Sequence, residues 1–311
     1  MKERELEVFS KSVFLLGMGV VVLLTSIFLF CNLMGELNYN KAISLEEPKF
    51  KEAKKDYYEK VFSFLNKAIF FNSLNSRYYI EKADFLLKSE EEGLLNSLGL
   101  KTSEAEFLYK EAVRLNPLSF VEHIKLGWYY RKNNPSLAEE ELLKAVELYP
   151  KDYQPYFYLS LYYFIQKKEI AGFKNFLIAY YYHARRFSKE RIKELISCLS
   201  NNPHIYYNPK RRQLQYIYNT QRDRVFFEDL FFPEVKVPIR IEVFLQNSQV
   251  EVLLLAKKGN FSQSFLKKVM KNNVFYYTFL REYPSHLSLK DLYIETNPFF
   301  PLQKIVFIIN I

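Results

Sequence analysis

The side chains that carry most enzyme chemistry are few and scattered in this chain. Its four histidines lie in different segments, and none is spaced with a second metal ligand or a nucleophile motif: His123, His183, His204 and His286. Eight glycines in 311 residues provide no glycine-rich phosphate loop. Cys31 and Cys198 fit neither a disulfide framework nor a metal-ligand spacing. We therefore predict no catalytic residue, no metal, no cofactor and no enzyme activity.

Two further groups of residues could serve a site but have a simpler structural role. Glu139, Glu140 and Glu141 are adjacent carboxylates at the start of a predicted helix, where negative charge complements the helix dipole. Four C-terminal aromatic residues could form a platform on which a sugar stacks: Tyr276, Tyr283, Phe299 and Phe300. Because aromatic residues make up 18% of the chain, core packing is the expected role of these rings.

A short phrase occurs twice in the centre of the chain. Residues 109–117 read YKEAVRLNP and residues 142–150 read LLKAVELYP, which places Ala112 and Ala145 33 residues apart (145 − 112). Between the copies, residues 126–130 read LGWYY. A fixed period in the low thirties, with small residues at helix contacts and a proline after the second helix, indicates a helical repeat array.

This pattern resembles the tetratricopeptide repeat (TPR) family, which has Leu-Gly and Tyr on the first helix of each repeat and Ala and Pro on the second. Three to four repeats are predicted within residues 50–184, with a closing helix at 188–199. Ser160 and His123 depart from the family pattern, and residues 88–102 form an insertion, either a tolerated surface loop or a contact loop. Ser103 and Ser136 each precede a glutamate by three residues, which predicts capping boxes.

The resemblance implies a concave array that binds a protein partner and whose first helices line the groove. Trp128 is the only tryptophan, a residue type enriched at binding hot spots, although packing between helices is the alternative role for it. The groove candidates are Arg77, Ile80, Asp84, Trp128, Arg131, Phe157, Leu161 and Phe164.

The N-terminal part of the chain contains a long apolar run. No residue between Lys11 and Glu36 is charged, and residues 13–34 would span about 33 Å as a helix, which matches a hydrocarbon core of about 30 Å. A cleaved signal peptide is the main alternative, but no cleavage site of small residues follows the run. We therefore predict a single-pass anchor in the cytoplasmic (inner) membrane. The positive charges on its two sides do not decide the orientation. Because residues 1–12 form only a short tail, we expect them in the cytoplasm and the bulk of the chain outside it.

Most of the net charge of +9 is concentrated after the array. Residues 185–224 contain ten Lys and Arg residues but only three acidic residues. Aromatic residues interleave with this basic patch, but the predicted location argues against nucleic acid. Three roles of the patch remain open: it contacts anionic lipid, it contacts an acidic polysaccharide, or it is simply a face exposed to water. The patch is Arg185, Arg186, Lys210, Arg211, Arg212, Arg222 and Arg224.

The pattern changes to a period of two from residue 235. Alternating apolar residues predict strands at 235–245, 250–254, 274–280, 292–296 and 305–309, which together suggest a small antiparallel β-sandwich. Residues 261–271 fit a helix or an irregular crossover. Residues 292–301, LYIETNPFFP, resemble the tail of β-domains on proteins associated with cell-surface polysaccharide machinery, of the O-antigen ligase type.

These features predict a multidomain chain, α then β. Its parts are a cytoplasmic tail (1–12), a transmembrane helix (13–34), a linker (35–49), a TPR-like α-solenoid (50–200), a basic connecting segment (201–234) and a C-terminal antiparallel β-sandwich (235–311). The predicted function is a membrane-anchored scaffold for protein–protein interactions in a cell-envelope assembly. The alternative is a carbohydrate-binding accessory protein of cell-surface polysaccharide polymerisation or export.

Overall fold

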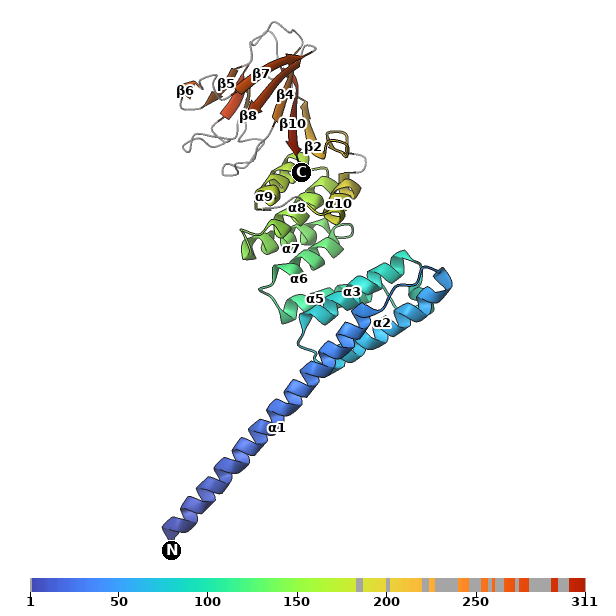
Figure 1. Ribbon diagram of the computed structural model, residues 1–311, viewed down its shortest axis with the longest axis vertical. Coiled ribbons are helices and arrows are strands. Elements are labelled where there is room, and N and C mark those ends of the chain that lie inside the picture. Colours follow the sequence, from blue (N-terminus) through green and yellow to red (C-terminus); the bar gives the residue numbers. More distant parts are fainter. Residues whose placement is uncertain are drawn as a thin grey trace. The chain divides into compact units, whose positions relative to one another are not determined.

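The computed structural model divides into two compact units, Met1–Tyr129 and Tyr130–Ile311. Helices form the first unit and the start of the second, and strands follow (Figure 1). The structure describes residues 2–182, 187–199, 202–219, 224–226, 240–245, 253–256, 259–260, 266–271, 274–279, 292–295 and 302–310.

The chain begins with one uninterrupted helix, α1 (Lys2–Ser44). Within α1, Gly17–Ser44 is long and apolar enough to cross a membrane, with a stretch of mean hydropathy 2.1 of which no part is buried. Exposed side chains along this stretch include Leu23, Phe28 and Leu29. In water such a surface would be unfavourable by roughly 25 cal/mol per Å² of apolar area.

The predicted linker at 35–49 is wrong in its first ten residues, because α1 continues through them to Ser44. Tyr39 and Ala42 are buried, so the polar composition of this segment hides a packed helix face. At Gly35, α1 comes close to the end of the following helix, since a Cβ built there would lie 3.1 Å from Asn72 Cβ and 3.4 Å from the carbonyl oxygen of Ala68. The end of α1 therefore acts as the first helix of the array.

Four more helices lie in the first unit, and a fifth, α6, ends at its border. They are α2 (Lys51–Phe71), α3 (Ser76–Glu91), the short α4 (Leu95–Leu98), α5 (Ser103–Leu115) and α6 (Phe120–Tyr130). The predicted insertion contains α4, flanked by Gly93 and Gly99, both with positive φ. Neither predicted capping box forms. Thr102 precedes α5 without a side-chain cap, and Asn134 caps the next helix by accepting from the N–H of Leu137.

The repeat is visible in three equivalent helix ends. Ala68, Ala112 and Ala145 are all buried, and the carbonyl oxygen of each accepts a hydrogen bond from the backbone N–H four residues later, at 2.9, 3.0 and 3.2 Å respectively. A small side chain at this position lets the neighbouring helix approach. The 33-residue period read from the sequence thus corresponds to a repeated helix–turn unit.

The second unit continues with α7 (Pro135–Leu148), α8 (Tyr153–Ile165), α9 (Glu169–Tyr182) and α10 (Lys189–Leu199). Helices α8 and α9 form a tight hairpin. Gly172 allows this contact, because a Cβ built there would lie 2.4 Å from Cδ1 and Cε1 of the buried Phe164 ring. Helix α10 packs on α8, as the predicted closing helix at 188–199 requires.

Ten strands follow among the residues of the second unit that the structure describes. Their bounds are β1 (Ile205–Asn208), β2 (Gln213–Asn219), β3 (Arg224–Phe226), β4 (Arg240–Leu245), β5 (Leu253–Ala256), β6 (Gly259–Asn260), β7 (Leu266–Lys271), β8 (Val274–Phe279), β9 (Leu292–Glu295) and β10 (Leu302–Asn310). The described pairs are antiparallel and form a six-stranded sheet, β1-β2-β10-β4-β8-β7, and a four-stranded sheet, β3-β9-β5-β6. That the two sheets pack as a sandwich stays a prediction.

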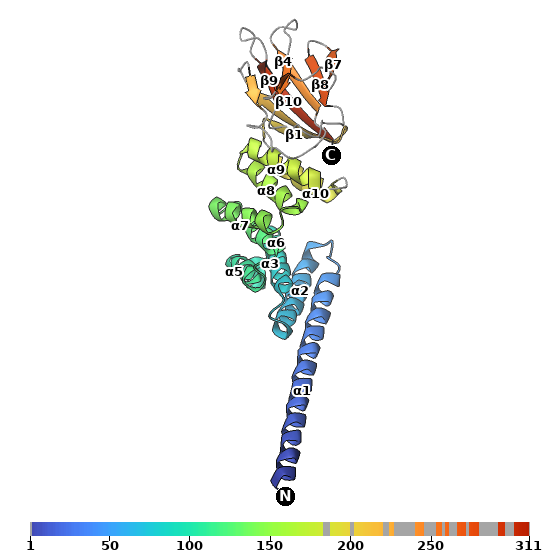
Figure 2. The ribbon, with the colours of Figure 1, turned by 90° about the vertical axis from the view of Figure 1, so that its left-hand side faces the viewer.

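Two sequence predictions for this region are wrong. The segment 201–234, expected to be a connection, contributes β1, β2 and β3, and β2 pairs with the last strand, β10. Residues 266–271, within the expected helix or crossover, form strand β7. The first strands also contact the helices of the same unit, and β1 lies beside α10 (Figure 2). The rings of Phe173 (α9) and Tyr216 (β2) are 5.1 Å apart.

Candidate functional site

A line of charged side chains runs along one face of α3 in the first unit. Arg77, Glu81 and Asp84 are spaced four and three residues apart, so they share a helix face. The guanidinium carbon of Arg77 lies 4.5 Å from the centroid of the Tyr39 ring, which belongs to α1. Tyr39 in turn donates a hydrogen bond of 3.5 Å from its hydroxyl to Glu81. We call Arg77, Glu81, Asp84, Lys125 and Trp128 the charged strip.

Helix α6 completes the charged strip. The Nζ atom of Lys125 lies 2.5 Å from Asp84 Oδ2, and Tyr109 donates a hydrogen bond of 2.5 Å from its hydroxyl to Asp84 Oδ1. Trp128 is three residues after Lys125 on α6 and is partly buried. The first helices α1, α3 and α6 therefore supply an array face that carries both signs of charge and one tryptophan.

Glu81 is the electrostatically strained member of the charged strip. Burial raises the pKa of its carboxyl, and the neighbouring carboxylate of Asp84 raises it further, while Lys125 and Arg77 offset part of the shift. Lys125 is already paired with Asp84. An added cation beside Glu81 would favour its charged form, so the charged strip suits a basic side chain of a partner.

Four of the eight groove candidates are not accessible. Ile80 in the first unit and Phe157, Leu161 and Phe164 in the second are buried. Arg131 is partly buried, and its carbonyl oxygen accepts a hydrogen bond of 3.2 Å from Gln166 Nε2. Arg77, Asp84 and Trp128 are the candidates that the first unit brings to one face. Glu81 and Lys125 were missed, although both lie one helical turn from a predicted residue.

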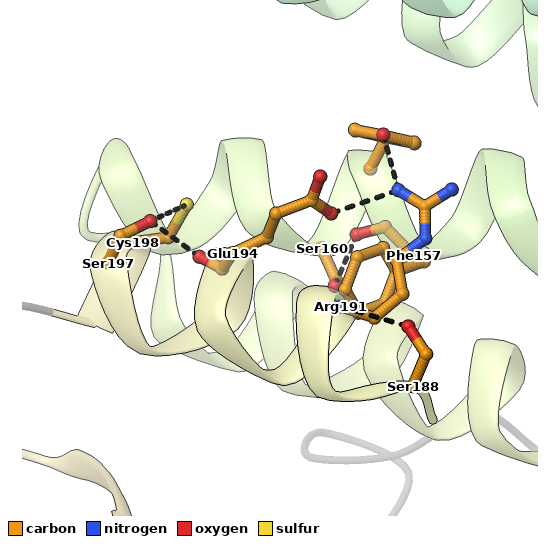
Figure 3. Close-up of polar contacts among 8 residues, drawn as sticks. Phe157, Ser160, Ser188, Arg191, Glu194, Ser197 and Cys198 are labelled. Carbon is orange, nitrogen blue, oxygen red and sulfur yellow. Dashed lines mark hydrogen bonds and ion pairs between the residues drawn. The ribbon is translucent and has the colours of Figure 1, made fainter. Parts of the chain in front are cut away.

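Phe157 is covered because α10 packs against α8 through Arg191 (Figure 3). The Arg191 guanidinium carbon lies 5.6 Å from the centroid of the Phe157 ring and 4.9 Å from that of Tyr158. Arg191 Nη1 also donates to the Tyr158 hydroxyl and to Glu194 Oε2, the latter at 2.9 Å. In the sequence, Arg191 is only one of ten positive charges within residues 185–224, whereas in the structure it holds the closing helix against α8.

A cavity of about 460 Å³ lies between α7, α8 and α9, all in the second unit. This volume is within the range typical of small-ligand or side-chain pockets. Tyr156 and Tyr182 stack at its edge with ring centroids 5.9 Å apart. Tyr163 donates a hydrogen bond of 2.9 Å to Glu139, which Lys168 also contacts at 2.9 Å. The lining residues are Leu143, Val146, Tyr156, Leu159, Tyr163, Ala171, Lys174, Asn175, Ile178 and Tyr182.

The basic patch does not form one surface within the described residues. Lys210, Arg211 and Arg212 form the turn between β1 and β2, where Lys210 and Arg211 are exposed. Arg224 belongs to β3 of the other sheet and pairs in register with Glu295. Arg185, Arg186 and Arg222 lie outside the described residues.

The histidines take structural roles where the structure describes them. His123 is buried, with its Nε2 atom 3.0 Å from the carbonyl oxygen of Pro117. His204 Nδ1 lies 3.1 Å from Glu169 Oε1. Among the residues with described placement, no three His, Cys, Asp or Glu side chains gather as a candidate metal site. His183 and His286 fall outside the described ranges.

Similarity to known proteins is found among solved structures. No protein-family model matches the chain, and no curated protein matches it. Among solved structures, the chain is similar to YrrB, described as a TPR protein with an unusual peptide-binding site. The identity is 19%, the alignment covers 53% of this chain and 86% of YrrB, and the TM-score is 0.32. A TM-score of this size carries no argument about function.

Proposed function

We propose that this protein is a single-pass, membrane-anchored helical-repeat scaffold that binds a protein partner through the charged strip. The observation that carries the proposal is the continuity of α1. One end of this helix exposes an apolar surface that needs an apolar environment, and the other end buries Tyr39 and Ala42 in the array. The same helix therefore belongs to both the anchor and the scaffold.

The continuity of α1 favours an uncleaved anchor over a signal peptide. Asn32 lies inside the predicted span and accepts a hydrogen bond of 2.6 Å from Asn72 Nδ2. Cleavage before the array would remove this contact. We further propose that residues 1–12 lie in the cytoplasm and that the array and strands lie outside the cytoplasmic membrane, in a cell-envelope assembly.

The partner that fits the charged strip is a peptide segment with at least one basic residue. Glu81 gains a counter-charge from such a residue. The Trp128 side chain, one turn after Lys125 on α6, offers apolar area. The packed helices hold these groups in place before binding, which lowers the entropic cost of association. We further propose that the two antiparallel sheets form a β-sandwich that contacts a second component of the assembly.

Photocrosslinking of the full-length protein in its native membrane tests this function. A photoreactive amino acid replaces Arg77 or Trp128, with exposed Lys110 on α5 as the matched control position. We expect both strip positions to capture the same protein. Combined Glu81→Gln and Asp84→Asn substitutions should weaken that capture without releasing the chain from the membrane. The proposed role of the strip would be contradicted if position 110 captured the protein equally well. It would also be contradicted if the combined substitutions left the capture unchanged.

A second candidate function is an accessory role in cell-surface polysaccharide polymerisation or export. The supporting observation is the turn between β1 and β2, which exposes the adjacent cations Lys210 and Arg211. Exposed, adjacent cations attract a polyanion in a salt-dependent manner. Lys210→Ser with Arg211→Ser should abolish retention on an anionic polysaccharide column at low salt, and unchanged retention would rule out this candidate.

A further inference from the structure

Two large apolar side chains are exposed where α2 turns into α3. Phe70 is 82% exposed and Leu74 is 72% exposed. The one ring contact described for Phe70 is with its neighbour in the sequence, Phe71, at 5.4 Å between ring centroids. Exposed apolar side chains that gather in one turn often mark an interaction surface.

The position of this turn along α1 is fixed by direct contacts. Asn72 Nδ2 donates a hydrogen bond of 2.6 Å to Asn32 Oδ1. One turn further along α1, Gly35 packs against Ala68 and Asn72. Figures 1 and 2 both show this end of α2 lying alongside α1. The turn at residues 72–75 therefore lies level with the last residues of the uncharged run 13–34.

The charges around the turn match those of a bilayer surface. No carboxylate occurs between Glu59 and Glu81, whereas Lys67 and Arg77 lie on either side of the turn and both are exposed. The acidic residue closest along α1, Glu36, accepts hydrogen bonds from Tyr78 at 2.8 Å and from Asn75 at 3.3 Å. Aromatic rings flanked by Lys and Arg are typical of the membrane–water interface, where lipid phosphates are nearby.

We propose that the α2–α3 turn is a second membrane contact, with Phe70 and Leu74 inserted among the lipid headgroups and upper acyl chains. This inference rests on the proposed role of α1 as a membrane anchor. Two contacts at different positions around α1 would stop the array from rotating freely about its anchor. The charged strip would then face a defined direction relative to the bilayer.

The test uses single-tryptophan variants of the full-length chain in a Trp128→Phe background. Tryptophan replaces Phe70, Phe50 or Leu23. Phe50 is the matched control, because it is a phenylalanine of similar exposure, 76%, at the other end of α2, about 30 Å away by helix rise. Leu23 reports on the anchor itself. The probes are vesicles of phosphatidylcholine and phosphatidylglycerol whose acyl chains are brominated either near the headgroup, at the depth proposed for position 70, or near the chain end, at the depth of position 23.

We expect brominated lipid to quench tryptophan at positions 23 and 70 but not at position 50, with a blue-shifted emission maximum at 70. If position 23 is quenched and position 70 behaves like position 50, the second contact is wrong and the anchor stands. If position 23 is not quenched, the anchor itself is wrong and the inference falls with it.

Discussion

Substitution of Gly172 by alanine should destabilise the second unit, although alanine favours helices. The added Cβ would lie 2.4 Å from two carbons of the Phe164 ring, closer than non-bonded carbons approach in proteins. Phe164 is buried and the surrounding α8–α9 hairpin is tightly packed, so the ring has little room to move. Overpacking of this kind costs about 1–3 kcal/mol, while the gain in helix propensity returns up to about 1 kcal/mol. The net loss in the free energy of unfolding should be about 1–2 kcal/mol.

Thermal unfolding of the full-length protein in detergent, followed by circular dichroism, measures this loss. A net change of about 1–2 kcal/mol should lower Tm by roughly 2–8 °C in a unit of this size. The control is Phe164→Leu, alone and combined with Gly172→Ala, because a smaller side chain removes the clash. The double variant should be more stable than the sum of the two single changes predicts, by about 0.5–3 kcal/mol. A higher Tm for Gly172→Ala, or strict additivity, would refute the packing argument.

Three further predictions concern Glu81, Cys198 and Arg191. Glu81→Gln should raise Tm at pH 7, because the folded-state pKa of Glu81 is raised and its negative charge lowers stability at that pH. The gain should vanish as the pH falls toward 4.5, the ordinary pKa of a glutamate, and a gain that does not depend on pH would contradict the shift. Burial raises the pKa of the Cys198 thiol to about 11. At pH 8, iodoacetamide should therefore modify Cys198 roughly 100-fold more slowly than the exposed thiol of a Ser197→Cys, Cys198→Ser variant. Equal rates would contradict this burial. Arg191→Met should speed amide hydrogen exchange in α10. Arg191→Lys should restore protection only in part, because lysine lacks the planar guanidinium that stacks on Phe157. Protection equal to wild type in both variants would show that Arg191 does not hold α10 in place.

The helical repeat could be predicted from the sequence because its small residues recur at fixed spacing. Ala112 and Ala145 are buried at equivalent helix ends, and Ala68 marks a third copy. Three of the five residues of the charged strip were predicted. Arg77, Asp84 and Trp128 follow from the repeat register, whereas Glu81 matters only because Tyr39, from a segment predicted as a linker, covers it.

The misses share a physical cause, which is long-range packing that local patterns do not encode. Residues 35–44 look polar, yet their apolar positions pack on α2 and extend α1. The basic residues 210–212 look like a connection because they form the turn of a hairpin whose strand β2 pairs with β10, about ninety residues later. Phe157 looks like a groove residue until α10 returns to cover it through Arg191.

The central claim is that one helix both anchors the chain in the membrane and begins the array. Intact-mass measurement of the full-length protein after alkaline washing of native membranes tests it most directly. We predict that the chain stays in the washed membranes and that its mass still includes residues 13–34. A chain released by the wash, or one shortened by removal of these residues, would contradict the claim.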